Sequence, residues 1–206
     1  MRPDLRIEPV PFDHPDAVAL RAAQRAELTA RYGTPDSEPG PAPTAADTTV
    51  FLLARDAGGD AVGCGALRAL GGGVGEVKRM YVVPARRRTG VAGVVLAALE
   101  AEAGRRGWTV LKLETGTEQP DAMAFYERHG YRRIPNFGHY AASELSVCYE
   151  RALVPDAMNA AAIPLPWSRL GRPARRSPGA GPAAGHAHGP RKAGPALPAG
   201  GSAELA

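Results

Sequence analysis

The sequence predicts a mixed α/β domain whose sheet is mostly antiparallel, and three observations support this class. Segments whose apolar residues recur every second position, as in strands, are interspersed with segments whose apolar residues have helical spacing. Three consecutive strand-like segments, at residues 50–55, 61–70 and 75–83, are joined by short glycine-containing turns, which favours an antiparallel meander. A further glycine-bearing turn then leads directly from the third strand into a helix.

The first part of the chain predicts one strand and one helix before this meander. Residues 5–10 alternate like a strand. A helix follows, for which Asp13 is the predicted N-cap, Pro15 lies in the first turn and Gly33 ends the helix. Residues 34–47 are rich in proline and predict a loop.

The part of the chain after the glycine-bearing turn predicts two more helices and three more strands. One apolar stripe with helical spacing is formed by Val91, Val94, Val95, Ala98 and Leu99. The remaining elements are a strand at residues 110–114, a helix at 120–129, and strands at 131–134 and 145–153. The sequence therefore predicts about six to seven strands flanked by helices.

Composition limits the class of protein. The chain has 206 residues, of which 44% are apolar and 22% charged, close to globular averages. No apolar run reaches the ~18 residues of a membrane-spanning helix, and the first residues lack the apolar core of a secretory signal. Cys64 and Cys148 form neither a disulfide framework nor a CxxC metal motif. We therefore expect a protein of the reducing cytoplasm with no membrane association.

The last part of the chain, residues 154–206, differs in composition from the rest. Ala, Pro and Gly make up 31 of its 53 residues, so we expect a disordered tail after a folded domain at residues 1–153. The tail holds six basic and two acidic residues. Of the 25 basic and 21 acidic residues in the chain, 19 of each then remain in the folded part. A neutral folded part gives no electrostatic reason to expect nucleic-acid binding by that domain.

The turn at residues 86–93, RRRTGVAG, is the most informative segment for function. The first N–H groups of a helix have no partner within the helix, and the helix dipole is positive there. Gly90, Ala92 and Gly93 allow an anion to approach these amides closely, and three arginines add positive charge. The turn therefore predicts a phosphate or pyrophosphate site. An ordinary connection between a strand and a helix is the alternative that the turn alone leaves open.

Three motifs in order resemble the GNAT superfamily of N-acetyltransferases. The pattern R-x-x-G-x-A at residues 87–92 matches the family's [Q/R]-x-x-G-x-[G/A] motif. Residues 80–84, MYVVP, resemble the strand that leads into that motif. Residues 122–131, AMAFYERHGY, resemble the later A-x-x-[F/L]-Y-x-x-x-G-[F/Y] helix. The resemblance covers residues 5–153 and implies a twisted sheet that is splayed at a cofactor site.

The resemblance also implies that acetyl-coenzyme A is the acetyl donor. Its pyrophosphate is expected on backbone amides at the start of the helix, and its pantetheine arm along the strand at residues 75–83. Gln119 stands where many relatives have an asparagine that contacts the arm. The implied cofactor-binding residues are Tyr81, Val82, Val83, Arg87, Arg88, Thr89, Gly90, Val91, Ala92, Gly93, Gln119 and Tyr126.

Acetyl transfer to an amine needs a base, an oxyanion-stabilising donor and an acid for the departing thiolate. The resemblance places the family's frequent general-acid tyrosine at Tyr126; a purely packing tyrosine is the alternative. The backbone N–H of Val82 is the expected oxyanion donor. Glu76 and Glu114 are the candidate bases, and the alternative is that both are partly exposed and ion-paired. His129 is interpreted as a surface residue that compensates a helix dipole.

We therefore expect an N-acetyltransferase that acts on a primary amine of a small molecule or peptide, by direct attack in a ternary complex and without a metal. A non-catalytic module that binds acyl-coenzyme A and signals through the tail is the alternative. A tail that binds nucleic acid or membranes is a third hypothesis. The sequence identifies neither the amine nor the oligomeric state, for which a homodimer is one option.

Overall fold

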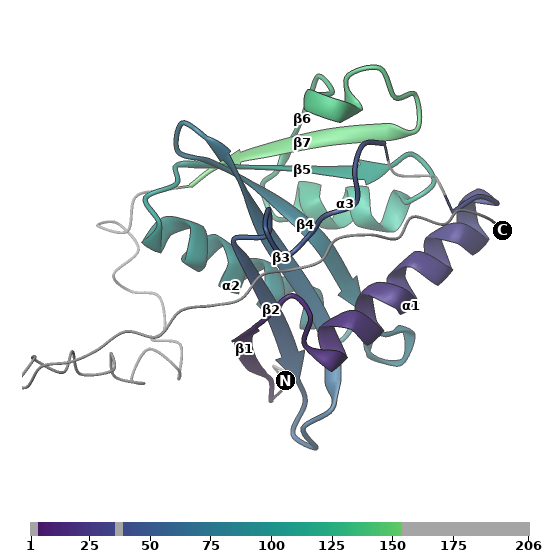
Figure 1. The fold of residues 1–206 in the computed structure, drawn as a ribbon, viewed down its shortest axis with the longest axis vertical. Coiled ribbons are helices and arrows are strands. Elements are labelled where there is room, and N and C mark those ends of the chain that lie inside the picture. The colour runs from purple at the N-terminus through teal and green to yellow at the C-terminus, as the bar shows by residue number, and fades with distance from the viewer. Residues whose placement is uncertain (1–3, 36–38, 154–206) are drawn as a thin grey trace, which may run out of the picture. The chain divides into compact units, whose positions relative to one another are not determined.

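Seven strands in one open sheet form the centre of the computed structural model, which describes residues 4–35 and 39–153. The strands lie in the order β1-β2-β3-β4-β5-β7-β6, and each neighbouring pair is antiparallel except β4 and β5. The mixed α/β class and the mostly antiparallel sheet are confirmed (Figure 1). The predicted disordered tail at residues 154–206 lies outside the described residues.

The element bounds agree with the predicted ones to within a few residues. The strands are β1 (Arg6–Val10), β2 (Val50–Arg55), β3 (Ala61–Gly71), β4 (Val74–Val82), β5 (Val110–Gly116), β6 (Arg132–Ile134) and β7 (Ser146–Ala152). The helices are α1 (Pro15–Tyr32), α2 (Val91–Arg105) and α3 (Pro120–Arg128), with 3-10 turns at Pro84–Arg86 and Gly138–Tyr140.

The helices cover both faces of the sheet. Leu52 and Ala54 of β2 point to the face where α2 packs, in a core that also takes in residues of α3. Phe51 and Leu53, which alternate with them, point to the other face and pack with Leu20 of α1. Alternation along a strand thus buries both faces, which explains why β2 reads as a continuous apolar run. Figure 1 shows α1 on one side of the sheet and α2 on the other.

The start of α1 corrects one predicted detail. The N-cap is His14, not Asp13: the His14 Nδ1 accepts a hydrogen bond from the Asp16 N–H at 3.2 Å. Pro15 occupies the first helical position and Gly33 ends the helix in the left-handed conformation, at φ 71°, as predicted. An imidazole nitrogen can accept a hydrogen bond from the first helical turn as a carboxylate does. Propensity favoured Asp13 over its neighbour His14, because Asp is a preferred N-cap residue and His is not.

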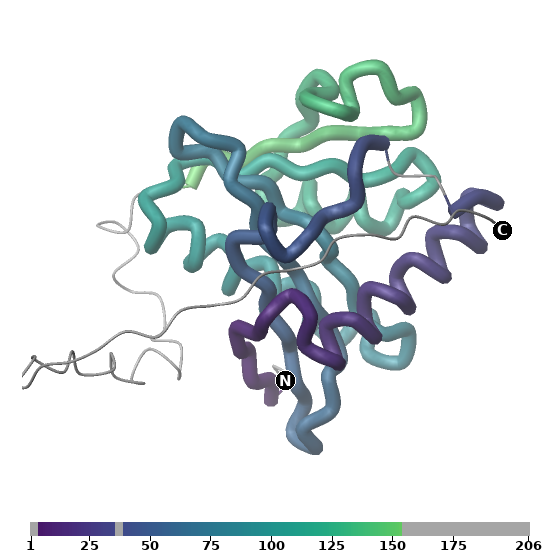
Figure 2. The backbone as a smooth tube through the Cα atoms, in the orientation of Figure 1, coloured from purple at the N-terminus to yellow at the C-terminus, as the bar shows by residue number. Residues whose placement is uncertain are grey.

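Glycines in β3 allow α2 to lie close to the sheet. A Cβ atom at Gly65 would lie 2.8 Å from the Leu99 side chain and 3.0 Å from that of Val95. A Cβ atom at Gly63 would lie 2.9 Å from Val91, the first residue of α2. The close packing fixes the start of α2 against the end of β4, where the candidate site lies (Figure 2).

Neither a membrane-spanning helix nor a metal cluster is found in the described part of the chain. None of the helices within residues 4–35 and 39–153 is long and apolar enough to cross a bilayer. In the same residues, no group of three or more His, Cys, Asp or Glu side chains could hold a metal ion.

Candidate active site

The strands β4 and β5 separate halfway along their length. They pair in parallel from Val74 with Val110 up to Val77 with Leu113, and no further pairing follows although both strands continue. A bulge in β4 adds to this separation. Between Cys64 and Ala66 of β3 there is one residue, whereas β4 has two residues in the same interval, and Arg79 there has φ 56°. The two strands fan apart in Figure 1.

The separated part of β4 presents backbone groups on its open edge. The Val83 N–H donates to Val62 in β3, so the Val82 N–H and C=O face the opposite side, away from β3. The Val82 carbonyl there accepts from Arg87 Nε at 3.0 Å, and the Met80 carbonyl accepts from Gln24 Nε2 at 3.0 Å. An open strand edge of this kind can bind an extended ligand through its main chain.

The turn before α2 presents uncapped backbone amides. Gly90 is the N-cap with φ 93°, and no side chain caps the helix. Arg88 also has a positive φ, 62°. In the described residues, the N–H groups from Arg88 to Gly93 donate to no protein acceptor. These amides are therefore available to an external acceptor, and the small residues keep the approach open.

The three arginines of this turn differ in their ion pairs. Arg86 forms an ion pair with Asp56 in the turn between β2 and β3. Arg87 binds Glu27 of α1, with Nη2 and Oε2 2.5 Å apart. Arg88 is exposed and forms no ion pair in the described residues. Of the three side chains that the sequence placed near the phosphates, Arg88 is therefore the one whose charge is not already paired.

Two cavities meet at the point where the strands separate. The larger, about 620 Å³, is lined by the turn, the start of α2 and one side of α3. The smaller, about 90 Å³, is lined by α1, β4 and the end of β5. Three residues line both cavities: Met80, Ala122 and Tyr126. A donor in the larger cavity and an acceptor in the smaller one would meet at these residues.

Tyr126 is buried at this junction. Its ring packs edge-on against Phe125 and Tyr131, with centroids 5.2 Å and 5.7 Å away. Burial raises the pKa of its hydroxyl above the ordinary value, and the negative charge of Glu114 raises it further. The phenol therefore stays protonated at neutral pH and can donate a hydrogen bond.

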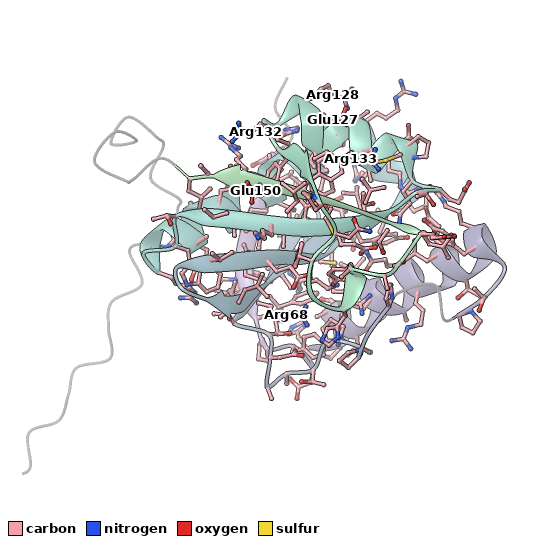
Figure 3. The ribbon with its side chains drawn as sticks, turned by 90° about the horizontal axis from the view of Figure 1, so that it is seen from above. Arg68, Glu127, Arg128, Arg132, Arg133 and Glu150 are labelled. Carbon is pink, nitrogen blue, oxygen red and sulfur yellow. The ribbon has the colours of Figure 1, made fainter. Side chains whose placement is uncertain are left out.

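Glu76 is wholly buried and lines neither cavity. Arg68 Nη2 and Nε lie 2.5 Å and 2.9 Å from its Oε2, and the Tyr140 hydroxyl donates to its Oε1 at 2.8 Å. Lys78 donates to the same hydroxyl at 2.7 Å. Figure 3 shows Arg68 on the opposite side of the strands from Arg128 on α3. Of the alternative in which Glu76 is partly exposed and ion-paired, the ion pairing is present, with Lys78 and Arg68, but the exposure is not, because the β6–β7 segment that carries Tyr140 covers the side chain.

Glu114 differs from Glu76 although it lies on the neighbouring strand. It is half-buried and lines the smaller cavity, and its Oε1 accepts from Ser146 Oγ at 2.7 Å. Gln119 lines the same cavity and not the larger one. Of the two predicted bases, the structure therefore brings Glu114 to the same cavity as Tyr126.

Other predicted binding residues lie around the larger cavity or beside it. Val91 is buried and its side chain belongs to the core, so only its backbone can face a ligand. The Thr89 hydroxyl donates to the Arg86 carbonyl at 2.7 Å. The cavity itself is lined by the predicted residues Tyr81, Val82, Arg87, Arg88, Gly90, Ala92, Gly93 and Tyr126.

The sequence did not point to α1 as part of the site. Gln24, Leu28 and Tyr32 line the smaller cavity, four residues apart on one face of the helix. The Tyr32 hydroxyl accepts from the Glu118 N–H at 3.2 Å. The four-residue spacing was present in the sequence, but it is equally typical of a helix that only packs on a sheet.

Comparisons with known proteins agree with this geometry. The sequence profile of the acetyltransferase (GNAT) family matches residues 18–131, more than half of the chain. The chain is 40% identical over 104 residues to an IAA acetyltransferase from Azospirillum brasilense, which covers 50% of this chain and 67% of the relative. It is 36% identical over 98 residues to the uncharacterised N-acetyltransferase YsnE of Bacillus subtilis, covering 47% and 65%.

Solved structures show the same fold. A Klebsiella pneumoniae protein assigned as an acyl-CoA N-acyltransferase is 33% identical, with a TM-score of 0.63 over 73% of this chain and 98% of that one. A GNAT acetyltransferase from Elizabethkingia anophelis, crystallised with acetyl-CoA bound, has a TM-score of 0.54 at 18% identity over 73% and 99%. The chain belongs to the GNAT family and is an acyltransferase.

Proposed function

We propose that this acyltransferase transfers the acetyl group of acetyl-coenzyme A to a primary amine of a small molecule or peptide. The observation that carries the proposal is the junction of the two cavities at Tyr126, directly beside the open edge of β4. The larger cavity has the uncapped amides that a diphosphate needs. The smaller one has a carboxylate, Glu114, and the size of a small polar group.

The residues then divide the work of direct attack. The amides from Arg88 to Gly93 bind the diphosphate, and the edge of β4 binds the pantetheine arm. Glu114 removes a proton from the attacking amine, directly or through water, and the Val82 N–H stabilises the charge on the carbonyl oxygen. Tyr126 is the acid for the departing thiolate: its raised pKa keeps the hydroxyl protonated across the neutral range, and it also makes the phenol a weaker acid than the thiol that forms, so the tyrosinate regains its proton from solvent.

The test is a thiol-release assay with a panel of primary amines, combined with isothermal titration of acetyl-coenzyme A. We expect binding by the wild type and thiol release that depends on an amine. Tyr126→Phe should lower kcat by about tenfold or more while acetyl-coenzyme A still binds. Absence of binding at millimolar donor would contradict the proposal.

Binding without thiol release for any amine would instead favour the non-catalytic alternative. The acyltransferase relatives already argue against that alternative. Phe125→Leu is a matched control, because this ring packs beside Tyr126 and carries no hydroxyl. A similar loss of kcat in both variants would assign Tyr126 a packing role only.

A further inference from the structure

His129 lies in the larger cavity, in the part that faces the start of α2 and is called the groove below. It follows the last residue of α3 and lines the larger cavity together with Gly93. The ring is half-buried in this groove, whereas its place near a helix end had suggested a surface residue. A Cβ atom at Gly93 would lie 3.4 Å from His129 Nε2, so this nitrogen faces the first turn of α2.

The hydrogen bond on the other side of the ring settles which nitrogen carries the fixed proton. His129 Nδ1 lies 2.8 Å from the Phe125 carbonyl oxygen. A carbonyl can only accept, so Nδ1 carries the hydrogen, and Nε2 is the nitrogen that gains or loses a proton. The Phe125 ring, with its centroid 4.3 Å from that of the imidazole, holds the ring in this orientation.

The charged groups around the groove are mostly positive. Arg88 in the turn and Arg128 on α3 line the groove with His129, and Asp121 lies at the other end of α3. Figure 3 shows Arg128 at the outer side of α3. A bound diphosphate would add negative charge among these cationic side chains, next to Nε2.

The acid on α2 that interacts with His129 is already paired. Glu100 binds Arg151 of β7, with Oε1 and Nη1 2.7 Å apart. Burial raises the pKa of Glu100, and the charges of Arg151 and His129 oppose this shift. Arg151 also approaches the end of α3, since a Cβ atom at Gly130 would lie 3.7 Å from its Nε. The acid that interacts with His129 is thus itself paired with a cation.

We infer that His129 takes up a proton from solvent when coenzyme A binds and donates from Nε2 to the diphosphate. The affinity for the donor then rises as the pH falls through the range in which imidazole titrates. Nε2 and the amides at the start of α2 are neighbours, so they would donate to the diphosphate side by side. This inference rests on the proposed function, because it needs coenzyme A in the larger cavity.

The experiment is isothermal titration with dephospho-coenzyme A, which lacks the 3′-phosphate and keeps a constant diphosphate charge between pH 5.5 and 8. For the wild type we expect the dissociation constant to fall about tenfold from pH 8 to pH 5.5, the range for a hydrogen bond to a charged group. Titration at pH 7 in buffers of different ionisation enthalpy should show proton uptake on binding. His129→Gln should remove both the pH dependence and the uptake.

His139→Gln is the matched control, because His139 is an exposed histidine outside the groove and should leave both readouts unchanged. Proton uptake by the wild type is measured without any variant, so a misfolded His129→Gln does not remove the test. Equal pH dependence in His129→Gln and wild type, or no proton uptake by the wild type, would overturn the inference and leave the proposed function intact. If neither dephospho-coenzyme A nor acetyl-coenzyme A binds at any pH, both this inference and the proposed function are overturned.

Discussion

The paired and the separated halves of β4 and β5 belong to the same two strands and differ in what satisfies their backbone. In the paired half, the strands bond to each other and the side chains of Val77 and Leu113 enter the core. In the separated half, the carbonyls of β4 are bonded by side chains from outside the sheet, Arg87 and Gln24. Side-chain donors can leave these carbonyls without disturbing the sheet, so an inner edge of this kind can exchange them for a ligand.

Glu76 and Glu114 differ in the same way as the two halves of these strands. Glu76 lies in the paired half, fully buried, with both oxygens bonded. Glu114 lies where β5 has left β4, half-buried at a cavity. The same residue type therefore stabilises the fold at one place and can serve chemistry at the other, because access to the cavity differs.

Removal of the Glu76 carboxylate should have the largest effect and tests the structural half of the comparison. Glu76→Ala leaves Arg68 and Lys78 without their buried counter-charge. We expect the free energy of unfolding in urea to fall by about 3–5 kcal/mol. Glu150→Ala, at a more exposed pair with Lys112, should cost about 1 kcal/mol or less. Equal costs would show that Glu76 is not a structural charge.

Glu114→Gln tests the separated half. The amide keeps the shape of the side chain but cannot remove a proton, so kcat should fall roughly 10²-fold in the thiol-release assay. The free energy of unfolding should change by only about 1 kcal/mol, since one bond to Ser146 is weakened. A large loss of stability with unchanged kcat would reverse the roles of the two glutamates.

Gly116→Ala tests the wall that α1 gives to the separated half. A Cβ atom there would lie 1.8 Å from the Tyr32 hydroxyl, so this ring must move and lose its bond from Glu118. We expect a loss of about 1 kcal/mol in stability and about fivefold in KM for the amine, with KM for acetyl-coenzyme A unchanged.

Gly104→Ala in α2 is the control for that variant, since nothing lies within 4 Å of a Cβ there. It should stabilise the helix by about 0.5–1 kcal/mol and leave both KM values unchanged. If both alanine variants raise KM for the amine alike, the contact between α1 and β5 does not shape the acceptor cavity.

The smallest expected effect concerns the edge of β4 that pairs with β3, at the bulge. Cys64 Sγ donates to the Arg79 carbonyl at 3.3 Å, and burial raises the pKa of the thiol to about 12. Because the thiol is un-ionised below that pH, a disulfide reagent at pH 8 should leave Cys64 unmodified in the native protein and modify it in urea. Rapid native labelling of Cys64 would show that the bulge opens to solvent.

Much of the fold, and the backbone geometry of the turn before α2, followed from the sequence. The strands around the glycine turns, and the apolar stripe from Val91 to Leu99, appear with nearly the predicted bounds. The uncapped amides of the turn were also predictable, because helix starts always lack internal acceptors and Gly90 keeps this one open. These are local features, decided by residues close to one another in the chain.

The lining of the smaller cavity was decided only by tertiary structure. Whether Glu76 or Glu114 meets a cavity depends on Tyr140, which lies 64 residues from Glu76 and covers it. That α1 contributes Gln24 depends on where β4 leaves β5, a contact between distant segments. The sequence alone thus determined the local backbone chemistry of this protein. Packing between remote elements decided which side chains reach the cavities, because exposure is a property of neighbours in space.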